Sequence, residues 1–169
     1  MDNHIEYLID ECKRQEESCL YTSTALFEWL KSMRIWRVVF VIAPIILGGI
    51  STWSLLTHRI GYEWITGTCA LLAGIIPAIY KALDFDVSLD VISQHAYQYK
   101  SLQDRFRQTW RITALEDSFK LRPELDILMS KMDEVRSASL TPPERFFRSA
   151  RKKIKDGHYR FTVDEGKAG

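Results

Sequence analysis

The sequence predicts an all-α membrane protein. We expect a two-transmembrane helical hairpin with long cytosolic helical arms that form an antiparallel helical bundle, followed by a short C-terminal helix. Two observations predict this fold. Residues 38–57 and 64–80 are apolar, contain no charged residue and are separated by only six residues. The segments on either side repeat apolar residues at 3-4 spacing, as helices do when they bury one stripe against another.

The two apolar stretches match the thickness of a bilayer. A helix needs about 20 apolar residues to cross the hydrocarbon core. A helix on the surface of a soluble protein carries charged residues on its outward face, and neither stretch has any. We therefore expect membrane spans at about residues 36–56 and 63–81, within a domain of residues 1–140. Residues 141–169 then form a basic helix and a flexible tail.

Basic residues indicate the orientation of the hairpin. Lys31, Arg34 and Arg37 precede the first stretch, and Lys81 follows the second. The connecting residues 58–63 carry one arginine, which a glutamate balances. Positive residues stay on the cytoplasmic side, so both termini are expected in the cytoplasm.

The arms carry matching apolar stripes. In the first arm the stripe is Ile5, Leu8, Cys12, Cys19, Leu26, Trp29 and Met33, with Gln15 and Thr22 in the gaps. In the second it is Phe85, Leu89, Ile92, Ala96, Tyr99, Phe106 and Trp110, with Gln103 in the gap. We expect two helices that each run unbroken from cytosol into bilayer and pair antiparallel. Stripes this long also predict self-association, although each single residue can serve packing alone.

Proline residues divide the C-terminal part. Arg122-Pro123 should interrupt the second arm, and a new stripe then predicts a separate helix to about residue 137. That stripe consists of Leu121, Leu125, Leu128, Met132 and Val135. Thr141-Pro142-Pro143-Glu144 has capping-box spacing, so a last helix should begin there and end at Asp156-Gly157. Residues 158–163 alternate weakly as a short strand would, and the final six residues are expected to be disordered.

Small residues mark one face of the apolar stretches. They are Gly67, Ala70, Gly74 and Ala78 in the second stretch and Gly48, Gly49, Ser51 and Ser54 in the first. Such residues let helices approach closely in lipid, so we expect a helix-packing or oligomer face there. Pro44 and Pro77 each free a carbonyl one turn earlier, which makes them candidate hinges.

The last helix is strongly basic. Six cations, Arg145, Arg148, Arg151, Lys152, Lys153 and Lys155, face one acid, Glu144, in residues 141–155. Such a helix can contact anionic lipid or bind a phosphate-bearing ligand. It can equally be a solvated end of the chain, and the sequence leaves these three interpretations open.

No catalytic set can be assembled from the sequence. The four histidines lie in four different segments, and there is no glycine-rich phosphate loop or metal-spaced Cys/His group. Cys12 and Cys19 are seven residues apart on a predicted helix, about 10 Å in rise, which is too far for a disulfide. We therefore expect no enzyme activity, no cofactor, no metal and no small-molecule substrate.

The layout resembles the SLATT family, two-transmembrane effector domains found beside nucleotide-second-messenger and related bacterial conflict systems. The resemblance covers about residues 20–135. It rests on the lead-in 29–37, the segment 44–52, the second stretch 67–80 and the following arm with Tyr97, Tyr99, Leu102, Phe106 and Arg107.

The resemblance implies a membrane effector of an anti-phage system in the bacterial inner membrane. Such an effector oligomerises and permeabilises or depolarises the membrane when an associated sensor triggers it. The partners implied are further copies of the chain, the lipid bilayer, and the sensor or its nucleotide or nucleic-acid product. The alternative is a non-conducting membrane anchor that recruits a cytosolic partner.

Overall fold

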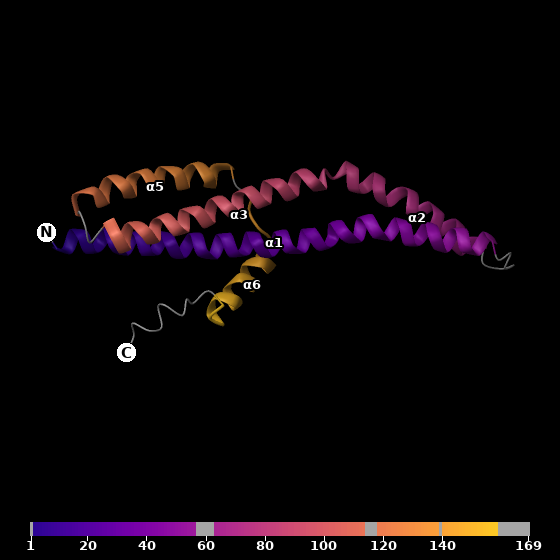
Figure 1. Ribbon diagram of the computed structural model, residues 1–169, viewed down its shortest axis with the longest axis horizontal. Helices are drawn as coiled ribbons and strands as arrows, with labels where there is room; N and C mark the ends of the chain where they lie inside the picture. The colour runs from indigo at the N-terminus through magenta and orange to yellow at the C-terminus, as the bar shows by residue number, and fades with distance from the viewer. Residues whose placement is uncertain (1, 57–62, 114–117, 139, 159–169) are drawn as a thin grey trace. The chain divides into compact units, whose positions relative to one another are not determined.

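All regular structure in the described part of the chain is helical, as the sequence predicts (Figure 1). The computed structural model describes residues 2–56, 63–113, 118–138 and 140–158. In chain order the helices are α1 (Asp2–Leu56), α2 (Glu63–Ala82), α3 (Phe85–Gln108), the π-helical turn η1 (Thr109–Thr113), α5 (Ser118–Ala138) and α6 (Glu144–Lys155). Contacts divide the chain into two units, residues 1–30 with 91–169, and residues 31–90.

The first arm and the first apolar stretch form one helix. α1 runs for 55 residues and continues through Pro44. A proline inside a helix removes one backbone hydrogen bond, and the chain remains helical on both sides of Pro44. The expectation of an unbroken helix from the first arm into the first stretch is confirmed.

The second arm does not continue directly from the second stretch. α2 ends at Ala82 and α3 begins at Phe85, with a two-residue turn between them. In this turn Asp84 has φ 42°, a left-handed conformation that aspartate tolerates better than most residues. The Asp84 N–H donates to the Lys81 carbonyl, and the Asp84 carbonyl accepts from the Ser88 N–H. The prediction of one unbroken helix was wrong here, because no glycine or proline marks the turn.

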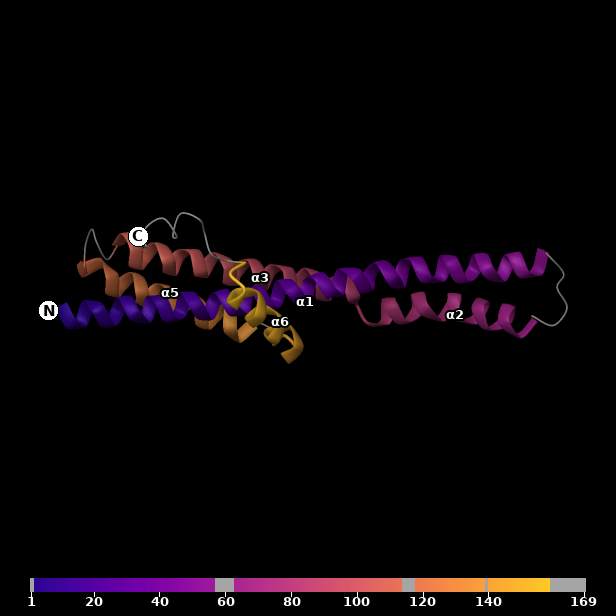
Figure 2. The ribbon, with the colours of Figure 1, turned by 90° about the horizontal axis from the view of Figure 1, so that it is seen from below.

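In the first unit, α1 and α3 lie side by side and antiparallel (Figure 2). The rings of Phe27 and Tyr97 meet edge to face with centroids 5.4 Å apart. Further along, Arg107 Nε donates to Glu16 Oε1 at 2.6 Å. The residue pairs therefore run in opposite directions along the two helices.

The predicted stripes supply much of the buried core of this unit. Its buried side chains include Cys12, Cys19 and Leu26 from α1, and Ile92, Ala96, Tyr99 and Phe106 from α3. The two glutamines in the gaps are buried as well, and both have partners: Gln15 accepts from Arg136, and Gln103 accepts from Lys100. Among the described residues, no buried side-chain nitrogen or oxygen lacks a hydrogen-bond partner.

The chain turns back earlier than Pro123. η1 ends at Thr113 and α5 begins at Ser118, so Pro123 lies inside α5 rather than at its start. Leu121, two residues before the proline, is fully buried, and burial of this side chain favours helix on the N-terminal side of Pro123. Leu125, Leu128 and Met132 of the predicted stripe are also buried, whereas Val135 at its end is only partly buried.

The last helix begins two residues later than the capping box predicts, with Pro143 rather than Thr141 at the N-cap. Pro143, with φ −57° and ψ 144°, is the residue before the helix, and no side chain caps it. Thr141 and Pro142 each precede a proline, which disfavours helical backbone at both positions. The end agrees with the prediction, because Asp156 follows the last turn and Gly157 adopts φ 82°. The predicted strand, apart from His158, and the six-residue tail lie outside the described residues.

Candidate functional site

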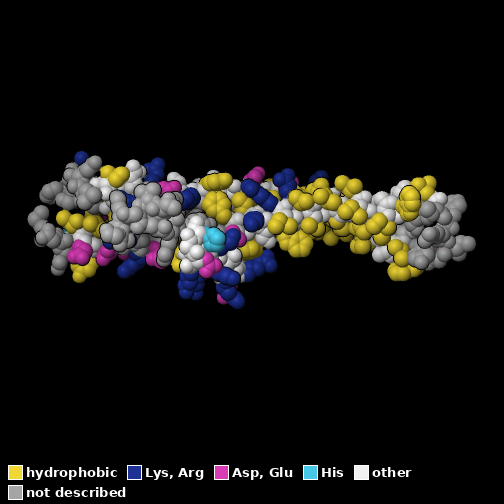
Figure 3. Space-filling view, turned by 60° about the horizontal axis from the view of Figure 1, so that its bottom comes forward, with side chains coloured by type: hydrophobic (Ala, Val, Ile, Leu, Met, Phe, Trp, Pro, Cys, Tyr) yellow, Lys and Arg dark blue, Asp and Glu magenta, His cyan; other side chains and the backbone are white. Residues whose placement is uncertain are grey.

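The second unit exposes an unusual amount of apolar surface. α1 and α2 are each long and apolar enough to cross a membrane. Only 6% of the residues in the most apolar 18-residue segment of each helix are buried, far too few for a core helix of a soluble protein. Ile45, Trp53 and Trp64 are each 70% or more exposed. Figure 3 shows this surface as hydrophobic side chains along α1 and α2 on the right.

α1 and α2 contact each other near both ends of α2. Ser51, which is buried, donates from its hydroxyl to the Thr66 carbonyl at 3.2 Å. Nearer the other end of α2, the rings of Phe40 and Tyr80 lie 6.1 Å apart. These pairs run in opposite directions, so the two helices are antiparallel within the unit.

The glycines and alanines are not part of this contact. A Cβ built on Gly48, Gly49, Gly67 or Gly74 meets no atom within 4 Å. Ala70 and Ala78 are exposed. Within one chain the contact between α1 and α2 is made by Ser51 and the aromatic rings. The helix-packing or oligomer face at the glycines and alanines stays a prediction. The glycine surface is open to a partner outside the chain.

The other polar and proline positions of the stretches lie within regular helix. Pro44 and Pro77 are inside α1 and α2, both assigned without interruption. The hydroxyls of Thr52 and Thr68 donate to the carbonyls of Gly48 and Trp64, four residues earlier in the same helices. The hydrogen bond of each threonine hydroxyl is therefore made within its own helix and does not require a water-filled pore.

A polar cluster marks one end of the apolar surface. Arg37 Nε lies 3.1 Å from Asp86 Oδ1, and the Tyr80 hydroxyl donates to the same oxygen at 2.8 Å. Asp86 lies in the first turn of α3, where its negative charge interacts favourably with the positive end of the helix dipole. The sequence indicated Arg37 as a cation beside the membrane span but did not indicate its partner. The turn at Asp84 brings the Asp86 carboxylate to Arg37, and that turn was not predicted.

The six basic residues of the last helix are divided by the structure. Five of them, Arg145, Arg148, Arg151, Lys152 and Lys155, are exposed. The sixth, Lys153, is half-buried and forms an ion pair with Glu28 of α1. Within the described residues Arg148 pairs with Glu144 and the Arg145 guanidinium lies over the Phe146 ring. The other three exposed cations form no ion pair with a described residue.

Part of the apolar face of α6 packs against α1. Phe146 and Ala150 are buried, and the Phe146 ring stacks on Trp29 with centroids 6.4 Å apart. An amphipathic helix that enters a lipid surface uses its apolar face to do so. In this arrangement Phe146 and Ala150 are not available to lipid, and the outward side of α6 carries its exposed cations.

Charged groups also join the arms of the first unit. Glu16 accepts from Arg107 Nε at 2.6 Å and from Trp110 Nε1 at 2.7 Å. The sequence stripes did not predict this junction, since Glu16 lies outside the apolar positions. The opposite signs of Glu16 and Arg107 were the available signal, but their pairing depends on the register of α1 against α3.

Burial raises the pKa of the two cysteine thiols in the first unit. Both are free thiols, and Cys19 Sγ contacts Met132 Sδ at 3.6 Å. Burial, aided by the charge of Glu11, raises the pKa of Cys12 from 9.0 to about 11. Burial, partly opposed by Arg136, raises the pKa of Cys19 from 9.0 to about 12. Both thiols are therefore neutral and unreactive at ordinary pH.

The described residues contain no group of three or more His, Cys, Asp or Glu side chains placed to hold a metal ion. Comparison with known proteins adds no relative. No family model matches the chain, and no curated protein or solved structure matches it.

Proposed function

We propose that this protein is a membrane effector of the SLATT type, which assembles from several copies and permeabilises or depolarises the bacterial inner membrane when an associated sensor triggers it. One observation carries the proposal: only 6% of the residues in the most apolar 18-residue segments of α1 and α2 are buried, and no other described segment covers the glycines there. Lipid would cover the large side chains, and a second copy would cover the glycines.

The polar groups around α1 and α2 support a two-span hairpin with both termini in the cytoplasm. Lys31, Arg34 and Arg37 precede the apolar part of α1, and Lys81 stands near the end of α2. Arg37 is paired with Asp86, so its charge has a partner at the membrane boundary. Tyr80 belongs to the same cluster, as expected of an amphipathic ring at the interface.

Open glycines support self-association as the source of a pore. In lipid there is no hydrophobic driving force that brings apolar helices together, because lipid tails are as apolar as the side chains. Helices therefore associate through close packing at small residues. Gly67 and Gly74 lie on an exposed part of α2 with free space around them. An assembly that packs these surfaces would place the Ile, Leu and Val side chains around its axis as a dry closed gate.

The experiment compares bulky substitutions on opposite faces of α2. Gly74→Leu should leave the single chain intact, because a Cβ at this position meets no neighbouring segment within 4 Å and leucine favours helix by up to about 1 kcal/mol. It should abolish assembly and membrane depolarisation. Leu72→Phe is the matched control, since residue 72 is exposed and two residues away, about 200° around the helix.

Assembly is measured by light scattering of the detergent-solubilised chain, and depolarisation by a voltage-sensitive dye in bacteria that express it with its neighbouring genes. We expect the wild type and Leu72→Phe to assemble and depolarise. An unchanged membrane potential with wild-type protein, with and without the neighbouring genes, would refute the effector function. Retained recruitment of a cytosolic partner by Gly74→Leu, without any depolarisation by the wild type, would favour the non-conducting anchor.

A further inference from the structure

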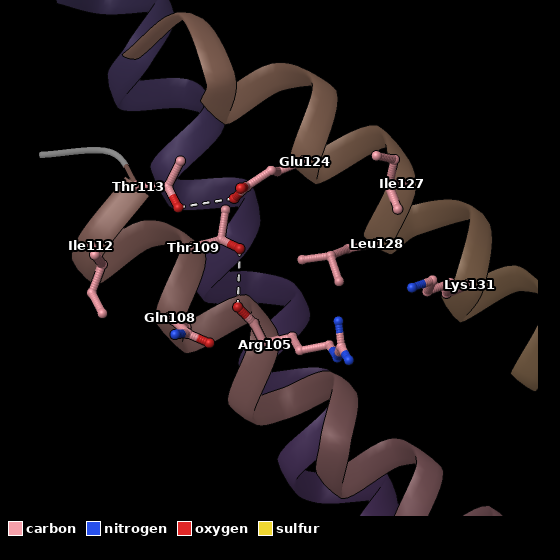
Figure 4. Close-up of a pocket in the computed structure, with 9 residues that line it drawn as sticks. All are labelled: Arg105, Gln108, Thr109, Ile112, Thr113, Glu124, Ile127, Leu128 and Lys131. Carbon is pink, nitrogen blue, oxygen red and sulfur yellow. Dashed lines mark hydrogen bonds between the residues drawn. The ribbon is translucent and has the colours of Figure 1, made fainter. Parts of the chain in front are cut away.

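A cavity lies where α3 and η1 face α5 (Figure 4). Its volume is about 320 Å³, at the lower end of the usual range for small-molecule sites. Its apolar lining comes from Ile112, Ile127 and Leu128, and its polar lining includes Gln108 and Thr109. It belongs entirely to the first unit and is separate from the apolar surface of α1 and α2.

Two cations on different helices point into this space. Figure 4 shows the side chains of Arg105, from α3, and Lys131, from α5, extending toward the same region beside Leu128. Neither cation has an ion pair among the described residues. Like charges brought toward each other repel, and an anion between them would reverse the sign of that interaction.

The acid in the cavity does not neutralise these cations. Glu124 accepts a hydrogen bond from the Thr113 hydroxyl at 2.9 Å, at the other end of the lining. The dashed line in Figure 4 marks this bond, and it directs the carboxylate toward η1. The cavity thus has one end occupied by an internal hydrogen bond and another where two cations meet.

The backbone at the cavity is also irregular. Thr109–Thr113 forms a π-helical turn, a feature that occurs mostly as short interruptions of α-helices and often at functional sites. Thr109 is buried and donates from its hydroxyl to the Arg105 carbonyl at 3.0 Å. The wider turn and this bond hold Arg105 and Ile112 on the same cavity.

We propose that this cavity binds a small organic anion, a molecule with one phosphate or carboxylate group on an apolar body. Arg105 and Lys131 hold the anionic group, because guanidinium and ammonium groups both donate charge-assisted hydrogen bonds to such oxygens. Ile112, Ile127 and Leu128 contact the apolar body. A bound ligand bridges η1 and α5 and replaces the repulsion between the two cations with two attractions.

Phenyl phosphate is a suitable probe, since it joins a phosphate to an apolar ring. The full chain in nanodiscs is titrated by calorimetry, with empty nanodiscs as the blank. We expect saturable binding with a dissociation constant on the order of 1 mM, weaker at high salt. Benzyl alcohol, which has the ring without the anion, should not bind.

Arg105→Gln and Lys131→Gln should each weaken phenyl phosphate binding about tenfold. Lys152→Gln is the matched control, since it removes the same charge from an exposed position on α6. Circular dichroism of each variant verifies that its helices are intact. Absence of saturable binding to the wild type would overturn the proposal, as would equal affinity in the wild type and both cavity variants. A loss in Lys152→Gln equal to theirs would show a general charge effect and overturn it too.

Discussion

The junction at Glu16 gives the sharpest test of how the arms are held together. Glu16→Gln keeps the size and shape of the side chain and removes its charge. In the wild type the two carboxylate oxygens accept from Arg107 at 2.6 Å and from Trp110 at 2.7 Å. The amide of glutamine has one oxygen, so one of the two donors loses its acceptor and meets an NH₂ group instead.

The expected loss follows from the burial of the pair. The Glu16 and Arg107 side chains are 15% and 24% exposed, so water only partly replaces the lost interaction. A hydrogen bond to a charged group contributes about 1.5–3 kcal/mol, and partial exposure favours the lower part of this range. We expect the free energy of unfolding to fall by about 2 kcal/mol, which lowers Tm by about 4–8 °C in a chain of this size.

Thermal unfolding in detergent, followed by circular dichroism, measures the change. Hydrogen exchange at the end of α3 and in η1 should increase in the same variant, because the lost contact holds this segment to α1. Glu17→Gln is the matched control, an identical change at an exposed neighbouring position. If Glu16→Gln melts and exchanges like the control, the junction does not stabilise the protein and the reasoning fails.

Three further predictions concern the first unit. Leu26→Ala should destabilise it by about 2–5 kcal/mol, because Leu26 is fully buried, and chemical unfolding measures the loss; a variant as stable as the wild type would contradict the packing described. Cys12 and Cys19 should resist alkylation in the folded protein. Their raised pKa values leave stability unaffected below pH 9, where the thiols are neutral in both states. Stability should then fall as pH rises from 9 toward about 11, because the unfolded thiols ionise first; unfolding curves with the same midpoint across that range would disprove this. Lys153→Gln should cost less than about 1 kcal/mol, since the ion pair with α1 is partly exposed, yet it should raise hydrogen exchange in α6. Unchanged exchange there would show that apolar packing alone holds the helix.

Local patterns explain why much of the helix content was predictable. Uninterrupted charge-free segments and 3-4 spacing are properties of neighbouring residues, and they led directly to α1, α2 and α3. The stripe in residues 121–135 likewise located most of α5. The errors lie at helix ends, where tertiary burial of Leu121 extends α5 past Pro123 and where Asp84 forms a turn without glycine.

The candidate sites were predicted less completely, for a different reason. Composition located the small residues and the basic helix. It did not indicate that Gly67 and Gly74 lack neighbours within the chain, or that Lys153 pairs with α1. The cavity with Arg105 and Lys131 was missed altogether, because its lining joins residues more than twenty positions apart.

By itself, the sequence determined which segments are helical, which face of each arm is buried and which two helices are apolar enough for lipid. These properties depend on side-chain periodicity and on transfer of apolar groups from water, both of which act locally along the chain. Only the tertiary structure decided which charges meet, which glycines remain open and where a cavity forms. Those outcomes depend on the register of one helix against another, which arises from many weak contacts between residues distant in the chain.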